Sequence, residues 1–204
     1  VAGSAGTGKT IVALHRAVYL ARQRPETRVL LATFSDTLAT ALRSKLRRLV
    51  SNEPRLAERL EVHSMNAVGE RMFEAAHGRP KLLDRTLLRK LLADSASTVS
   101  GNKFSTAFLL GEWEELVDAW QLATWDEYRD VKRLGRKTRL SEAQRAALWA
   151  IFESTLSRIS NSKLKTHSAI FTQLAAELKG RKSPPFDFVV LDEAQDVSVA
   201  QLKF

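Results

Sequence analysis

A phosphate-binding motif near the start of the chain constrains its fold more than any other feature. The stretch GSAGTGKT matches the pattern G-x-x-x-x-G-K-[ST] at every fixed position. Glycines at these places let the backbone curl so that successive N–H groups point at phosphate oxygens. We therefore predict that the loop binds the phosphates of a nucleotide through eight residues: Gly3, Ser4, Ala5, Gly6, Thr7, Gly8, Lys9 and Thr10.

The last two residues of the motif have separate expected roles. Lys9 is expected to reach the β- and γ-phosphates, and the Thr10 hydroxyl is expected to coordinate Mg²⁺. The segment 11–24 carries apolar residues at helical spacing, so a helix would direct its positive N-terminal end at the phosphates. The alternative for the glycine-rich stretch is a flexible turn that binds no ligand, and such a turn would not need to be followed by a helix.

An acidic motif near the other end of the chain is expected to complete the site. The run FVVL at 188–191 is apolar without alternation, which predicts a parallel strand covered on both faces. Asp192 follows it and can hold Mg²⁺ through water, while Glu193 can orient and deprotonate an attacking water. The alternative is that these acidic residues only cap the next helix. Together the two motifs predict a nucleotide and Mg²⁺ as cofactors, and the family resemblance described next implies that the nucleotide is ATP.

DEAQD after an apolar strand, together with GSAGTGKT, resembles superfamily 1 helicases of the UvrD/Rep type. RVLLATFSDTLA, at 28–39, resembles the family's second motif, in which a strand ends in Thr-Phe-Ser/Thr. Val62-His63-Ser64 resembles its Thr-Phe-His-Ser/Gly segment, although Glu61 and Val62 replace the usual Thr-Phe pair. The resemblance covers 1–78 and about 166–204. It implies an α/β fold, namely a RecA-like P-loop NTPase with a parallel sheet flanked by helices.

The resemblance also implies a set of DNA contacts. In the family these strand ends contact single-stranded DNA, so Phe34 would stack on a base, and Ser35, His63 and Ser64 would contact the DNA backbone. Gln195 would link the γ-phosphate to the DNA side and is counted with Lys9 and Glu193 as catalytic. Taken alone, Phe34 would more often be a core residue and His63 a structural histidine.

The middle of the chain has a helical pattern, which predicts an all-helical subdomain inserted at 79–165 between the motor-lobe parts 1–78 and 166–204. Trp113, Leu116, Val117 and Trp120 fall on one helical face, and we expect the four tryptophans to form a core. A second amphipathic helix is expected over Ala143–Ile159, with Ser141 as its N-cap. Five basic residues lie between 132 and 139, either in a solvated loop or against phosphates.

The net charge of +9 favours a polyanionic partner, although a solvated basic surface would also account for it. Cysteine is absent, which excludes disulfides and thiolate metal sites and fits a cytoplasmic protein. No apolar stretch approaches the length of a membrane span, so no membrane association is expected.

These observations predict the ATP-binding part of an ATP-dependent DNA helicase or translocase, with 3′-to-5′ polarity implied by the resemblance alone. Its partners would be single-stranded DNA, or a junction with duplex, and a second motor lobe that this chain does not contain. By itself the chain should bind nucleotide weakly and unwind little. Two alternatives stay open: an ATPase that remodels RNA polymerase or another complex without unwinding, and a non-catalytic nucleotide-dependent binding module.

Overall fold

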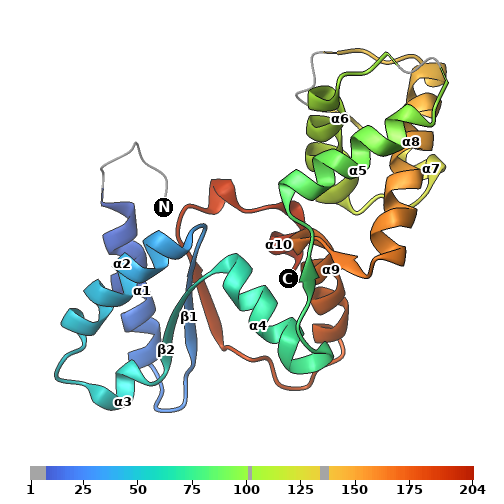
Figure 1. The fold of residues 1–204 in the computed structure, drawn as a ribbon. Helices are drawn as coiled ribbons and strands as arrows, with labels where there is room; N and C mark the ends of the chain where they lie inside the picture. The colour runs from blue at the N-terminus through green and yellow to red at the C-terminus, as the bar shows by residue number, and fades with distance from the viewer. Residues whose placement is uncertain (1–7, 101–102, 134–137) are drawn as a thin grey trace. The chain divides into compact units, whose positions relative to one another are not determined.

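The computed structural model describes residues 8–100, 103–133 and 138–204, which form two compact units (Figure 1). The sheet unit comprises Val1–Met72 and Ala176–Val197, and the helical unit comprises Phe73–Ala175 and Ser198–Phe204. Val1–Thr7, which hold most of the predicted phosphate loop, lie outside the described residues. The predicted division at 78 and 165 stays a prediction.

The sheet unit contains a three-stranded parallel sheet in the order β2-β1-β5. Its strands are β1 (Val29–Thr33), β2 (Leu60–Ser64) and β5 (Phe188–Leu191). The helices of this unit include α1 (Lys9–Arg22), α2 (Asp36–Leu49) and α3 (Pro54–Ala57), with α1 and α2 packed against the strands (Figure 1). The predicted α/β class with parallel strands is therefore confirmed.

The central strand β1 organises the core of the sheet unit. All five of its residues are buried, and Val29 and Leu31 pack with apolar side chains of α1 and α2 such as Leu14 and Leu42. Helix α2 begins directly after the strand because Ser35 caps it: its Oγ accepts a hydrogen bond from the Leu38 amide at 3.2 Å. The tight strand-to-helix turn leaves Phe34 at the carboxyl end of β1.

Strand β5 corrects one prediction. The run FVVL was expected to be covered on both faces, but Phe188 and Val189 are 43% and 57% exposed. Within the described part of the sheet β5 pairs with β1 alone, so it lies at an edge of that described part. A strand at an edge is covered less than a central one, and an apolar run cannot by itself reveal its place in the sheet order. Val190 still packs against the core.

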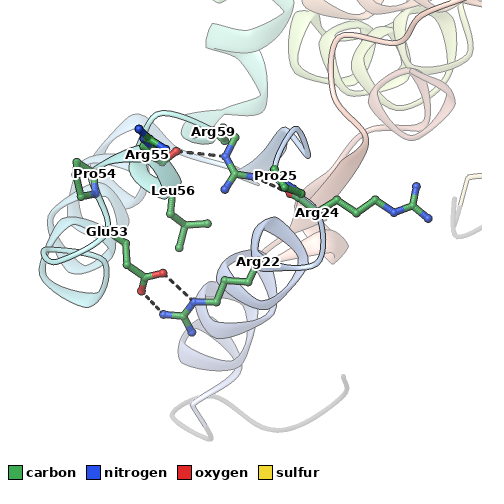
Figure 2. A pocket seen from close by; sticks show the side chains of 8 residues that line it. All are labelled: Arg22, Arg24, Pro25, Glu53, Pro54, Arg55, Leu56 and Arg59. Carbon is green, nitrogen blue, oxygen red and sulfur yellow. Dashed lines mark hydrogen bonds and ion pairs between the residues drawn. The ribbon is translucent and has the colours of Figure 1, made fainter.

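An arginine clamp fixes the C-terminal end of α1. Arg59 donates from Nη1 to the carbonyls of Ala21 and Arg24 at 2.9 and 2.8 Å, and from Nε to the carbonyl of Arg55 at 3.2 Å. Arg22 forms an ion pair with Glu53 at 2.5 Å. Figure 2 shows these side chains around a basic pocket of about 530 Å³, in which Arg59 and Arg22 are occupied by internal partners. These hydrogen bonds and the ion pair therefore fix the C-terminal end of α1, and Lys9 lies at the N-terminal end of the same helix.

The helical unit is built mainly from α5 (Arg85–Ser97), α6 (Thr106–Glu112), a π-helix (Trp113–Asp118), α7 (Trp125–Asp130) and α8 (Glu142–Asn161). Ser141 caps α8 as predicted, in a capping box with Gln144.

Strands β3 (Lys81–Leu82) and β4 (Leu164–Lys165) pair in parallel, so the expectation of an all-helical 79–165 segment is wrong at its two ends. Two-residue strands are too short to leave a sequence pattern. The remaining helices are α4 (Met65–His77), α9 (His167–Leu178) and α10 (Val199–Lys203).

The π-helix explains why one tryptophan departs from the expected core. Trp113, Leu116 and Val117 are buried as predicted, but Trp120 is 49% exposed, with the Lys203 Nζ 5.9 Å from its ring centroid. The π-helix has wider turns than the α-helix assumed for the face prediction, so residues beyond it leave that face. Gln121, in a left-handed conformation at φ 54°, then ends the helical stretch.

A buried ion pair corrects the interpretation of the basic run at 132–139. Arg133 donates from Nε and Nη2 to Glu112 at 2.7 Å each; their side chains are 6% and 0% exposed. The Tyr128 hydroxyl also donates to Glu112, at 3.0 Å, and burial followed by this carboxylate raises the Tyr128 pKa. Arg133 is therefore a core residue of the helical unit, and Arg136 and Lys137 lie outside the described residues.

None of the helices in the described ranges is long and apolar enough to cross a membrane.

Candidate nucleotide and nucleic-acid site

A groove in the sheet unit brings the two predicted nucleotide motifs together. It measures about 610 Å³ and is formed by α1 and by the chain that leaves β5. It is lined by Lys9, Val12, Ala13, Arg16, Val190, Leu191, Asp192, Glu193, Ala194 and Gln195. Lys9 thus shares one groove with Asp192, Glu193 and Gln195, although more than 180 residues of sequence separate them. The loop residues from Gly3 to Thr7 lie outside the described residues.

The start of α1 presents positive potential at this groove. Gly8 precedes the helix at φ 79°, a left-handed conformation that glycine adopts without strain, and its carbonyl accepts the amides of Ile11 and Val12. The described part of this N-terminus has no side-chain cap and no acidic residue in its first turn. The positive end of this helix and the Lys9 ammonium are suited to an anionic group such as a phosphate. Thr10 follows in the same turn and is half-buried.

Asp192 has the environment of a cation ligand. Its side chain belongs to a residue that is 4% exposed, and its amide donates to the Ala32 carbonyl at 2.9 Å, which fixes the backbone. Its Oδ2 has no hydrogen-bond partner among the described residues. A buried carboxylate oxygen without a partner is costly, and Mg²⁺ prefers such hard oxygen ligands. The Asp192 carboxylate and the Thr10 hydroxyl therefore fit a magnesium ion by their chemistry.

Glu193 is held in an unusual backbone conformation. Its φ of 57° and ψ of 48° are left-handed, which costs free energy for a residue other than glycine. The turn places the Glu193 side chain at the groove, where its Oε2 accepts a hydrogen bond from the Gln195 Nε2. Strain of this kind occurs at functional sites, where the side chain has to point in one direction.

The predicted nucleic-acid residues lie at the carboxyl ends of β1 and β2, at the same end of the sheet. Phe34 is 54% exposed, so its ring is accessible to a ligand. Ser35 uses its Oγ as the acceptor that caps α2. Ser64 is 2% exposed, donates to Asp36 Oδ1 at 2.5 Å and accepts from the Ala67 amide at 3.3 Å. The Ser64 hydroxyl therefore joins the end of β2 to the start of α2; its predicted DNA contact stays a prediction.

A charged cluster around His63 was missed by sequence reasoning. Glu61 accepts from Arg71 at 2.7 Å and from Arg28 at 2.9 Å, and the Arg71 Nη1 lies 3.2 Å from the His63 Nε2. Burial raises the pKa of Glu61, but the two arginines together hold it below its ordinary value. Burial, followed by Arg71, lowers the pKa of His63, so this ring is neutral at pH 7. The signal was present: Glu61 and His63 alternate with apolar residues, which places them on one face of the strand.

A family comparison identifies the chain. The family described as the UvrD/REP helicase N-terminal domain matches residues 1–204, the whole of the sequence. The chain belongs to this family. No curated protein matches the chain. Membership in the UvrD/REP helicase family implies a helicase-type ATPase with a nucleic acid substrate, and it confirms the family resemblance carried by the phosphate loop and DEAQD.

Membership also explains why the groove unites residues from opposite ends of the sequence. A UvrD/REP N-terminal domain uses ATP, and the groove offers a lysine, a buried carboxylate and a strained glutamate at one strand end. The role of each individual residue in this UvrD/REP domain stays a prediction, which the experiments below address.

Proposed function

We propose that this chain is the first motor lobe of an ATP-dependent DNA helicase or translocase that moves along single-stranded DNA. The groove that unites Lys9 with Asp192 and Glu193 carries the proposal. Phe34 supports it, because an exposed aromatic ring at the carboxyl end of the neighbouring strand offers a surface for a base. The 3′-to-5′ polarity rests on the family resemblance alone.

In the proposed mechanism Lys9 and the amides at the start of α1 bind the triphosphate. Thr10 and Asp192 would hold Mg²⁺, which would supply positive charge to the phosphate oxygens. Glu193 orients the attacking water and accepts its proton, and Gln195 holds the Glu193 carboxylate through the hydrogen bond described above. A second motor lobe supplies the arginines that stabilise the transferring phosphoryl group, so turnover requires both lobes.

Lys9→Ala tests the nucleotide site. We expect nucleotide affinity to fall by about 2–3 kcal/mol, because an ammonium paired with a phosphate in a groove is lost. Titration of this chain with a fluorescent ATP analogue in the presence of Mg²⁺ measures the change. Lys45→Ala removes an exposed lysine of α2 outside the groove and is the matched control. Equal affinities for the Lys9 variant and the wild type would contradict the proposed site.

Phe34→Ala tests the nucleic-acid surface. We expect the affinity for single-stranded DNA to fall by about 1–3 kcal/mol, the range for loss of one stacked base. Tyr19→Ala is the matched control, since Tyr19 is an equally exposed aromatic residue on α1, at 53% against 54%. Fluorescence anisotropy with a labelled oligonucleotide at fixed salt compares the two. Equal DNA affinities of the Phe34→Ala and Tyr19→Ala variants would contradict base stacking and leave Phe34 as a packing residue.

Strand-displacement assays on the two-lobed protein separate unwinding from the protein-remodelling alternative. DNA-stimulated ATP turnover together with displacement supports the helicase proposal. Strong stimulation with no displacement on any fork would favour a motor that remodels a protein complex.

A further inference from the structure

In the part of the chain that the structure describes, two buried polar groups at adjacent strand ends lack hydrogen-bond partners. The proposed function uses only one of them, the Asp192 carboxylate. The Thr33 Oγ1 and the Asp192 Oδ2 are both buried without a hydrogen-bond partner among the described residues. Thr33 is 0% exposed and Asp192 is 4% exposed. A buried hydroxyl or carboxylate oxygen in this condition destabilises the chain unless a bound group satisfies it.

The strand register places these two groups next to each other. Ala32 of β1 pairs with Leu191 of β5, and the Asp192 amide donates to the Ala32 carbonyl at 2.9 Å. One step further along the parallel pair, Thr33 and Asp192 are therefore cross-strand neighbours. Alternation along each strand puts Thr33 on the same face as Leu31, and Asp192 on the same face as Val190.

That face is the one covered by α1. Leu31 and Val190 are partners in the register and pack in the same core as Leu14 of α1. Thr33 and Asp192 hence lie on the α1 side of the sheet, the side from which Lys9 enters the groove. A hydroxyl donor and a carboxylate acceptor that are neighbours but not bonded to each other can both be satisfied by a third group that hydrogen-bonds to each of them.

We propose that Thr33 is a positioning residue of the magnesium site, whose hydroxyl and the Asp192 Oδ2 are joined through one ordered water molecule when Mg²⁺ and nucleotide bind. This inference rests on the proposed function and extends its site by one residue. A buried water makes about three hydrogen bonds, so it can satisfy both orphaned groups at once. Loss of a group that orients a metal ligand typically lowers metal affinity by about 10–100-fold.

The position of Thr33 in the chain gives this contact a second consequence. Thr33 is followed directly by Phe34, the exposed residue of the proposed DNA surface. A base that binds Phe34 therefore acts on the residue next to the hydroxyl that orients Asp192. The end of β1 connects the DNA side with the magnesium side through a single peptide unit.

Thr33→Val tests the inference, because valine keeps the shape of threonine and removes only the hydroxyl. We expect opposite effects in the two states of this chain. The Tm of the nucleotide-free chain should rise by about 2–4 °C, since an unpaired buried hydroxyl is replaced by a methyl group. The affinity for an ATP analogue in Mg²⁺ should fall by about 10-fold and should be unchanged in EDTA. Thr33→Ser should restore the magnesium-dependent affinity.

Thr155→Val provides the matched control. Thr155 is equally buried, but its hydroxyl donates to the Ile151 carbonyl at 2.9 Å, so its loss should neither raise the Tm nor change nucleotide affinity. Wild-type affinity of Thr33→Val in Mg²⁺ would overturn the inference, as would an equal loss in EDTA or a lowered Tm. In each of these results the proposed nucleotide site still stands if Lys9→Ala loses affinity, and it fails only if that variant binds normally.

Discussion

Glu193→Gln is expected to lower DNA-stimulated ATP turnover in the two-lobed protein by about 1,000-fold, within the range for loss of a general base. Glutamine has the shape of glutamate and can still accept the hydrogen bond from Gln195, but it cannot take a proton from water. Nucleotide affinity should therefore stay at its wild-type value while hydrolysis stops. A steady-state ATPase assay and an equilibrium titration with an ATP analogue measure the two quantities separately.

Asp196→Asn is the matched control for this experiment. Asp196 lies in the same acidic motif, is exposed and does not line the groove. Its substitution should leave both quantities unchanged. Retained turnover in Glu193→Gln would remove Glu193 from the role of base, whereas lost nucleotide affinity would make it a binding residue instead.

Arg133→Met is expected to lower the free energy of unfolding by about 3–5 kcal/mol, the cost of leaving one charge of a buried ion pair without its partner. Glu112 is 0% exposed, and Arg133 supplies two of its hydrogen bonds. After the substitution the Glu112 carboxylate keeps the Tyr128 hydroxyl, which cannot balance its charge. Urea denaturation followed by tryptophan fluorescence measures the loss, because Trp113 and Trp149 belong to the core of the helical unit.

Two further variants make this second result specific. Lys132→Met removes the exposed neighbour of Arg133 and should change stability little. Arg133→Met combined with Glu112→Leu should recover part of the loss, because no buried charge remains unpaired, although the Tyr128 hydroxyl then lacks its acceptor. If Arg133→Met is no more destabilising than Lys132→Met, the ion pair does not stabilise the helical unit.

The parts of the molecule that were predictable from sequence are those with local signals. The glycine spacing of GSAGTGKT, the apolar run before Asp192 and the Ser141 cap each depend on residues within a few positions of one another. The helix after Gly8, the strand Phe188–Leu191 and the helix from Glu142 follow from these patterns. The family itself was recognisable because several such signals occur in a fixed order.

The features that were missed depend on tertiary partners distant in sequence. No residue close to Arg133 in the sequence indicates that Glu112 lies beside it in the fold. The charge of Arg133 therefore suggested a solvated or phosphate-facing residue. The exposure of Val189 depends on which strands flank β5, and that of Trp120 on the wider turns of the π-helix. The hydrogen bond from the Ser64 hydroxyl to Asp36 was missed for the same reason, because the two residues lie 28 positions apart in the sequence.

The left-handed backbone at Glu193 has a consequence for how this chain can evolve. Only glycine would occupy that conformation without cost, and glycine would also remove the carboxylate that the proposed mechanism needs. Selection for a more robust fold and selection for a working motor therefore favour different residues at this one position. A chain of this fold that did not hydrolyse ATP would not need the carboxylate, and glycine at this position would then increase its stability without a loss of activity.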